Sequence, residues 1–209
     1  MPSNARKNLE ANLKDVERLQ GLHATVGGHS KGRRWNVECL NKASLVLVCG
    51  AWEAYLEDVC QEGLKHLIVY NAPGGLSMTA QGIRNNFIAA NPGATQQQIL
   101  GQLSEQLWVE NKFNTPKSAN IVSLFNRVFG LPDVTTPWYW QKSSVAQTRN
   151  RIDTYVSLRG QIAHRSSANN YVRKPVVTAF SELVLDLSTK VDDSVRAHVN
   201  GMTPGTPIF

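Results

Sequence analysis

Residues 35–70 read WNVECLNKASLVLVCGAWEAYLEDVCQEGLKHLIVY and carry the most regular hydrophobic pattern in the chain. Apolar or small residues recur three and four positions apart over many turns, which is the spacing of one face of an α-helix. The residues on this face are Leu45, Val48, Cys49, Trp52, Leu56, Val59, Cys60, Gly63 and Leu67. The pattern predicts a long central helix.

Shorter amphipathic segments flank this helix in the sequence. Helices are expected at residues 4–22, 79–89, 95–108, 116–130 and 144–164, with a last helix opened by Pro175. Gly21 and the glycine pair 27–28 are expected to end the first helix, whereas Thr95 and Gln98 resemble a capping box. No segment alternates like a strand and no repeat is present.

The expected fold is therefore all-α, a bundle of about six to seven helices. A chain of 209 residues is within the range that one hydrophobic core supports, so residues 1–200 are expected to form a single domain. Residues 201–209 contain glycine and proline and are expected to form a flexible C-terminal tail.

Several classes of protein are disfavoured by composition. The longest apolar run, residues 43–52, is too short to cross a bilayer, which takes about 20 residues, and the N-terminus lacks the apolar segment of a signal peptide. Cys39, Cys49 and Cys60 form no Cys-x-x-Cys pair and favour buried thiols over a disulfide or a metal site. We expect a cytoplasmic protein that uses no membrane, metal or cofactor.

The positive charge is concentrated in one segment. Residues 127–174 contain eight Lys and Arg residues against Asp133 and Asp153, an excess of six that equals the net charge of +6 for the whole chain. Such a segment favours a polyanionic partner such as RNA, through phosphate contacts and counterion release. A solvated basic face without a partner is an equally good interpretation.

Within this segment, residues 153–165 read DTYVSLRGQIAHR and place a charge where the helical pattern requires an apolar residue. Arg159 shares a stripe with Ile152, Tyr155, Val156, Ile162 and Ala163. A guanidinium on such a stripe needs a partner, a cavity or a ligand. His164 lies about 140° around the helix from Arg159, so the two can share a site only if the helix bends or a second helix or subunit contributes.

An arginine and a histidine at this spacing are a weak signal by themselves. Arg18 and His23 have the same spacing, but Arg18 lies opposite the apolar stripe of its helix and Gly21 interrupts the interval. Position therefore distinguishes Arg159 and His164 from a chance match.

Other segments have two interpretations each. Glu53 and Glu57 share a helix face and could position a base or pair with an arginine, although a solvated face is more common. The basic loop 29–34 could touch phosphate or simply be exposed. The aromatic run 137–140, PWYW, could stack on unpaired bases but is more typical of a lid on the core.

These residues resemble a known family. Residues 158–165, LRGQIAHR, are similar to the R-x4-6-H motif of HEPN domains, and the resemblance to the RiboL-PSP-HEPN branch covers roughly residues 35–195. Its other segments are AWEAYLEDV at 51–59, FNTP at 113–116, NIVSLF at 120–125 and FGL at 129–131. The resemblance implies a helical bundle that dimerises through the motif-bearing face, and a metal-independent endoribonuclease of a toxin–antitoxin or antiphage system.

The resemblance also implies roles for residues. His164 would move the proton of the RNA 2′-hydroxyl, and Arg159 would bind the phosphate as charge builds. The supporting candidates are Glu53, Glu57, Asp153, Gln161 and Arg165, and the RNA-binding candidates are Arg149, Arg151, Arg173 and Lys174. RNA, a second copy of the chain and an antitoxin or defence-system protein are the expected partners.

One position departs from the family pattern. The residue after the motif arginine is commonly polar in HEPN proteins, whereas here it is Gly160. This departure keeps a second hypothesis open, a non-catalytic HEPN-fold module that binds RNA or protein. A third hypothesis, a helical scaffold unrelated to nucleic acid, predicts binding that is insensitive to salt.

Overall fold

A computed structural model describes residues 1–27, 37–109, 113–165 and 172–209. These ranges fold into α-helices with no strand, which confirms the all-α expectation. The helices are α1 (Asn4–Gly27), α2 (Glu38–Val69), α3 (Met78–Ala90), α4 (Gln96–Ser104), α5 (Ser118–Phe129), α6 (Val145–Arg165) and α7 (Lys174–Met202). Two short elements join them, a 3-10 turn at Pro73–Gly75 and a π-helical turn at Glu105–Val109.

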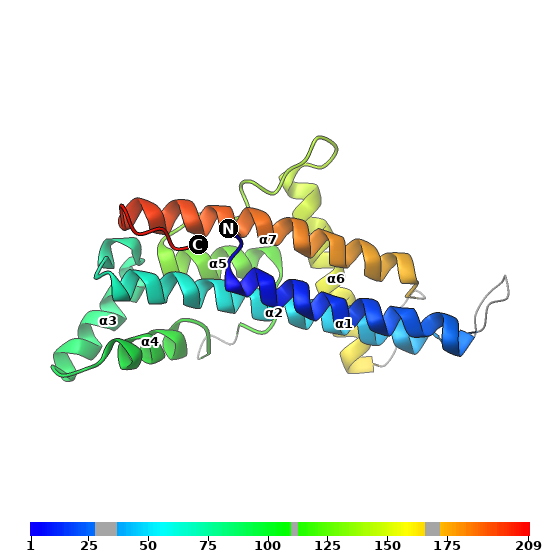
Figure 1. The fold of residues 1–209 in the computed structure, drawn as a ribbon, viewed down its shortest axis with the longest axis horizontal. Helices are drawn as coiled ribbons and strands as arrows, with labels where there is room; N and C mark the ends of the chain where they lie inside the picture. Colours follow the sequence, from blue (N-terminus) through cyan, green and yellow to red (C-terminus); the bar gives the residue numbers. More distant parts are fainter. Residues whose placement is uncertain (28–36, 110–112, 166–171) are drawn as a thin grey trace.

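Helix α2 is the centre of the bundle, as its hydrophobic pattern predicts. Figure 1 shows α1, α2 and α7 running side by side along the long axis, and α2 also contacts α4, α5 and α6. Trp52 and Tyr55 are fully buried on α2, with ring centroids 5.4 Å apart, and Cys49 and Cys60 are buried free thiols. The apolar stripe is thus covered on several sides, because burying it supplies much of the stability of the fold.

Helix α1 is longer than expected. Gly21 lies inside it, and the helix continues to Gly27. A glycine inside a helix costs roughly 1 kcal/mol relative to alanine, but the turns of α1 that precede Gly21 are packed in the bundle and bonded to α2. Leu13 and Val16 are buried, and the Gln20 side chain donates a 2.6 Å hydrogen bond to Ser44 Oγ.

The start of α1 is anchored to α7 and α2 by polar contacts. The Ser3 backbone N–H and hydroxyl donate to the Asp192 carboxylate at 2.9 and 2.8 Å, and Tyr55 Oη donates to the same carboxylate at 2.9 Å. Glu62 accepts the backbone N–H groups of Asn4 and Ala5, which have no partner within the helix. These bonds join the first helix to the last.

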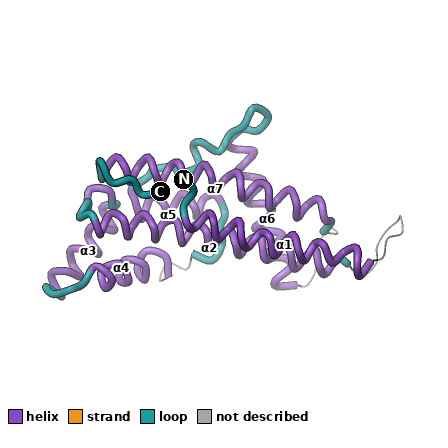
Figure 2. The backbone as a smooth tube through the Cα atoms, viewed as in Figure 1, coloured by secondary structure: helices purple, strands orange, loops and turns teal. Residues whose placement is uncertain are grey.

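The cap signals read from the sequence are present in the fold. Thr95 and Gln98 form a capping box at the start of α4. Gly130 ends α5 with a φ of 73°, a left-handed conformation that glycine adopts without strain. Figure 2 shows the long connection that follows, an extended loop between α5 and α6.

The last residues pack against the body of the protein, although they were expected to form a flexible tail from residue 201. Met202 still belongs to α7. Beyond it, the Thr206 carbonyl lies 2.9 Å from His66 Nε2, and the Ile208 N–H donates to Asn200 Oδ1 at 2.9 Å. Phe209 also packs against the Arg196 guanidinium. Side-chain contacts that glycine and proline content does not indicate hold this segment.

In the described ranges, none of the helices combines the length and the apolar character needed to cross a membrane.

Candidate nuclease site

Helix α6 supplies the Arg and His motif, and its apolar stripe holds it against the bundle. Ile152, Val156 and Ile162 are buried, and the Tyr155 ring stacks on Phe180 of α7 with centroids 4.5 Å apart. Ala163 was expected on the same stripe but is exposed. Contact with the bundle therefore weakens after Ile162, in the last turn of the helix.

Arg159 occupies the stripe position that the pattern assigned to it and faces α2. Its side chain is partly buried. Burial raises the pKa values of Cys49 and Glu53 on α2, and the positive charge of Arg159 reduces both shifts. Its Nε atom is fully buried and has no hydrogen-bond partner among the described residues. The guanidinium also forms no ion pair within those ranges. A half-buried cation with spare donors is suited to an anionic ligand.

The carboxylates beside Arg159 are held in a partly dry environment. Burial raises the pKa of Glu53, and Arg159 opposes that shift. The pKa of Glu57 is raised by burial and by the nearby charges of Glu53 and Asp58. Of the two candidates, Glu53 is therefore the one whose pKa the charge of Arg159 affects, although the two side chains form no ion pair.

Cys49 is not a competing nucleophile at this site. Burial is the main effect that raises its pKa to about 11, so the thiol is neutral near pH 7.

The remaining motif residues lie in the last two turns of α6. Gln161 is exposed, and a Cβ built on Gly160 would meet no atom within 4 Å. His164 and Arg165 belong to the final turn, but their side chains are outside the described part of the chain. The helical backbone places His164 about 140° around the axis from Arg159, as expected from the spacing.

Asp153, a supporting candidate, serves the fold. Its carboxylate accepts the Ser118 backbone N–H at 2.7 Å and the Ser118 hydroxyl at 2.9 Å. It thereby caps the first turn of α5, where a carboxylate is favoured by the free N–H groups. Arg149 and Asp153 are four residues apart on α6, a spacing that favours a local ion pair, but Arg149 pairs with another carboxylate.

Arg149 pairs with a loop instead. Its Nη2 donates to Asp133, and its Nε donates to Thr135 Oγ1 at 2.7 Å. Although partial burial raises the Asp133 pKa, the hydrogen bonds from Thr135 and Arg149 outweigh that effect and lower it. Of the four RNA-binding candidates, Arg149 is the one that the structure ties to an internal ion pair.

The other three basic candidates are exposed and lie at two places. Arg151 is on the first half of α6 and lines a small cavity. Arg173 and Lys174 are at the start of α7, where the Val172 carbonyl accepts a 2.9 Å hydrogen bond from Asn41 of α2. The basic loop 29–34 lies outside the described residues.

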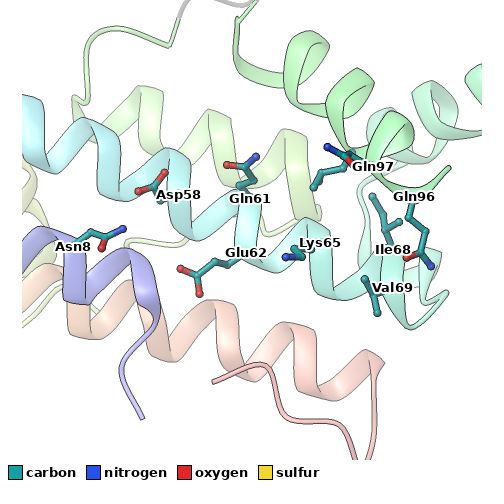
Figure 3. Close-up of a pocket in the computed structure, with 10 residues that line it drawn as sticks. Asn8, Asp58, Gln61, Glu62, Lys65, Ile68, Val69, Gln96 and Gln97 are labelled. Carbon is teal, nitrogen blue, oxygen red and sulfur yellow. The ribbon is translucent and has the colours of Figure 1, made fainter.

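The sequence did not indicate a groove of about 570 Å³ that lies between α1, α2 and α4. Figure 3 shows Asp58, Gln61, Glu62 and Lys65 along α2, with Gln96 and Gln97 at the start of α4. Glu62 is engaged by the start of α1, and Asn8 donates to Asp58. Asp58, Glu62 and Lys65 are three and four positions apart on α2. This spacing, which places them on one face of the helix, is the sequence signal that could have indicated the groove.

The described residues contain no group of three or more His, Cys, Asp or Glu side chains arranged to hold a metal ion.

A comparison with protein families matches residues 6–197 to RiboL-PSP-HEPN. The chain belongs to this family. The matched region of the HEPN chain contains both Arg159 and His164, and it extends the resemblance seen in the sequence to include α1. Family membership is confirmed, whereas the roles of individual residues are not part of that match.

Searches of curated proteins and of solved structures returned no significant match to this HEPN chain.

Proposed function

We propose that this HEPN protein is a metal-independent endoribonuclease whose active site forms when two copies associate. The observation that carries the proposal is Arg159, a partly buried cation beside Glu53 with no described hydrogen bond to its Nε atom. Buried N–H donors are nearly always hydrogen-bonded in folded proteins, so an unpaired donor of this kind is suited to a ligand that accepts its hydrogen bond. The phosphodiester of RNA supplies oxygens that match the two-pronged donor set of a guanidinium.

The reaction needs only two groups from the protein. His164 removes the proton of the 2′-hydroxyl, because an imidazole with a pKa near 6.5 exchanges protons around neutral pH. The oxygen then attacks the adjacent phosphorus to form a cyclic phosphate, and the 5′-oxygen of the next nucleotide leaves with the proton that the protonated His164 returns to it. Arg159 binds the phosphate oxygens while negative charge accumulates on them. Glu53 orients the guanidinium.

A second copy would resolve the angular separation of Arg159 and His164. Gly50 and Gly160 carry no side chain and face open space, since a Cβ at either position would meet nothing within 4 Å. Leu47 and Ala54 are exposed on the same side of α2 as Gly50. Such a surface lets two helices approach closely and would bring the last turn of a partner α6 towards Arg159.

The experiment is an RNA cleavage assay on wild type, His164→Ala and Arg159→Ala, run with and without EDTA. We expect wild type to cleave single-stranded RNA in EDTA and both variants to lose at least roughly 100-fold in rate. Arg18→Ala is the matched control, because Arg18 has the same spacing to a histidine but lies on an exposed ion pair with Asp15. Full activity of His164→Ala would contradict the mechanism.

Gly160 favours a second candidate, a non-catalytic HEPN module that binds RNA or protein. A side chain fits at this position without a clash, so Gly160→Asn tests it directly. No cleavage by wild type, together with cleavage by Gly160→Asn, would identify a binding module that has lost a catalytic residue. Equal cleavage by both proteins would support the nuclease.

The biological setting follows from the same proposal. A nuclease of this kind acts as a toxin or antiphage effector in the cytoplasm, and an antitoxin or defence-system protein restrains it. Co-expression that relieves growth inhibition by wild type, but is unnecessary for His164→Ala, would identify such a partner.

A further inference from the structure

A second cavity, of about 300 Å³, lies where the loop before α6 meets α6 and α7. Figure 1 shows this loop projecting beyond α7 between α5 and α6. The loop contributes Trp140, Lys142 and Ser143, α6 contributes Arg151, and α7 contributes Glu182 and Asp186. The cavity therefore combines an aromatic ring with side chains of both charges.

The loop is held in place before any ligand arrives. Trp138 is fully buried and packs on Trp52, while the backbones of Trp140 and Ser143 exchange hydrogen bonds of 2.9 and 3.0 Å. The Ser143 hydroxyl also lies 3.1 Å from the Thr148 hydroxyl on α6. A loop that is already ordered loses little conformational entropy on binding.

The two aromatic rings that follow Trp138 are less buried than it is. Tyr139 is 62% exposed and Trp140 is partly exposed. The Lys190 ammonium lies 4.7 Å from the Trp140 ring centroid and 5.3 Å from that of Tyr139. An exposed aromatic surface with a lysine beside it provides a face for a base and a charge for a phosphate.

The charged side chains that line the cavity do not pair with one another. Among the described residues, Lys142 and Arg151 form no ion pair, and neither do Glu182 and Asp186 on successive turns of α7. A nucleotide offers a counterpart to both signs, since its phosphate accepts from cations and its base can donate N–H groups to carboxylates. A simple anion or a simple cation would leave half of the set unmatched.

We infer that this cavity binds one unpaired nucleotide of an RNA strand. The base stacks on Trp140, which lines the cavity, and on the exposed ring of Tyr139, which lies next to the same Lys190 ammonium. Lys142 and Arg151 bind its phosphate. Glu182 and Asp186 accept N–H groups from the edge of the base, which favours guanine, with adjacent ring and amino donors, over uracil, whose single donor is flanked by carbonyl oxygens.

The position on α6 connects this subsite to the proposed nuclease site. Arg151 and Arg159 are about 12 Å apart along the helix axis and about 80° apart around it. That length corresponds to three or four nucleotides stacked at about 3.4 Å each. The inference rests on the proposed function only in naming RNA as the ligand, and a strand held here would run towards Arg159.

The test measures binding of two single-stranded RNA pentanucleotides, one rich in guanine and one of uracil, to the His164→Ala protein. Tyr139→Ala should weaken binding of the guanine-rich RNA roughly 5- to 150-fold. Tyr139→Phe, which keeps the stacking face, should bind like the parent. Tyr70→Ala is the matched control, because Tyr70 is a similarly exposed tyrosine that directly follows α2 and does not line this cavity.

Paired substitutions test the charged groups. Lys142→Ala with Arg151→Ala should weaken binding of both pentanucleotides, and Glu182→Gln with Asp186→Asn should reduce the preference for guanine. The inference is overturned if Tyr139→Ala binds like the parent while its melting temperature is unchanged, or if uracil binds as tightly as guanine.

Cleavage by the wild-type chain, which keeps His164, distinguishes this inference from the proposed function. If the wild-type chain cleaves RNA but Tyr139→Ala does not weaken binding, the subsite is ruled out and the nuclease function stands. If Tyr139→Ala weakens binding but the wild-type chain cleaves no RNA, the subsite stands and the nuclease function is ruled out.

Discussion

The two halves of α6 use their polar residues in opposite ways. In the first half, Arg149 is bound to Asp133 and Thr135, and Asp153 caps α5 through Ser118. In the second half, the buried Nε of Arg159 has no partner among the described residues, and Gly160 faces open space. Both halves are basic, so net charge does not distinguish them.

The difference shows which residues the fold needs and which it tolerates. A polar group whose hydrogen bonds are all made within the chain contributes to stability, whereas a desolvated group without a partner costs free energy. Substitutions of Arg149 and Asp153 should therefore affect unfolding, and substitution of Arg159 should affect activity. The following variants test that division.

Arg159→Ala should have the largest effect, on cleavage alone. Loss of the phosphate donor lowers the single-turnover rate by roughly 100- to 1000-fold, while removal of a buried unpaired Nε leaves the melting temperature unchanged or slightly raised. Arg159→Lys should recover little activity, because an ammonium lacks the planar pair of donors. A fall in melting temperature with normal cleavage would place Arg159 with the structural residues instead.

Asp153→Ala should have the largest effect on stability. It removes two hydrogen bonds at the start of α5 and is expected to lower the free energy of unfolding by about 2 kcal/mol. Urea unfolding monitored by circular dichroism measures this change. Cleavage per folded molecule should stay at the wild-type rate, and a selective loss of cleavage would show that Asp153 belongs to the active site.

Arg149→Ala should destabilise the protein by about 1 kcal/mol, because the pair with Asp133 is partly exposed. The Asp133 pKa is lowered in the folded state, so its contribution is present above the unfolded value near about 3.9 and is lost as pH falls through the folded pKa. Wild type and variant should converge in stability at low pH. Arg151→Ala, which removes no described hydrogen bond or ion pair, should match wild type throughout.

Glu57→Gln should have the smallest effect and the opposite sign. The folded-state pKa of Glu57 is raised by burial and by neighbouring carboxylates, so ionisation costs stability as pH rises through the unfolded value towards the folded one. The variant should be more stable than wild type at pH 7, by less than about 1 kcal/mol. This gain should disappear below about pH 4, and a gain that persists there would have a different cause.

The helices were predictable because the residues that a helix buries recur three and four positions apart in the sequence. The stripes of α2 and α6 were read correctly at almost every position, and Thr95 and Gly130 marked helix ends by local chemistry alone. The expectation that Gly21 would end the first helix was wrong, because the free energy that a glycine costs inside a helix is smaller than the free energy gained by packing α1 against α2. Local propensity is a weak constraint where tertiary contacts are extensive.

The partners of polar residues were not predictable from spacing. Arg149 and Asp153 are one turn apart and suggest a pair, yet each bonds to a segment that is remote in sequence. Arg159 was the exception, because a charge on an apolar stripe marks a conflict that can be seen without knowing the partner. The aromatic run was likewise divided only by the fold, which buries Trp138 and exposes Tyr139.

The contact of Ser3 with Asp192 has a consequence for how the chain folds during synthesis. The two residues are 189 positions apart, and Tyr55 reaches the same carboxylate from the central helix. Loop closure over such a separation is slow, and the N-terminal helix leaves the ribosome long before its anchor exists. The apolar stripe of α1 therefore packs first against α2 alone. A ribosome that stalls before residue 192 would leave a chain in which Glu62 holds the start of α1 and Ser3 has no carboxylate to bind.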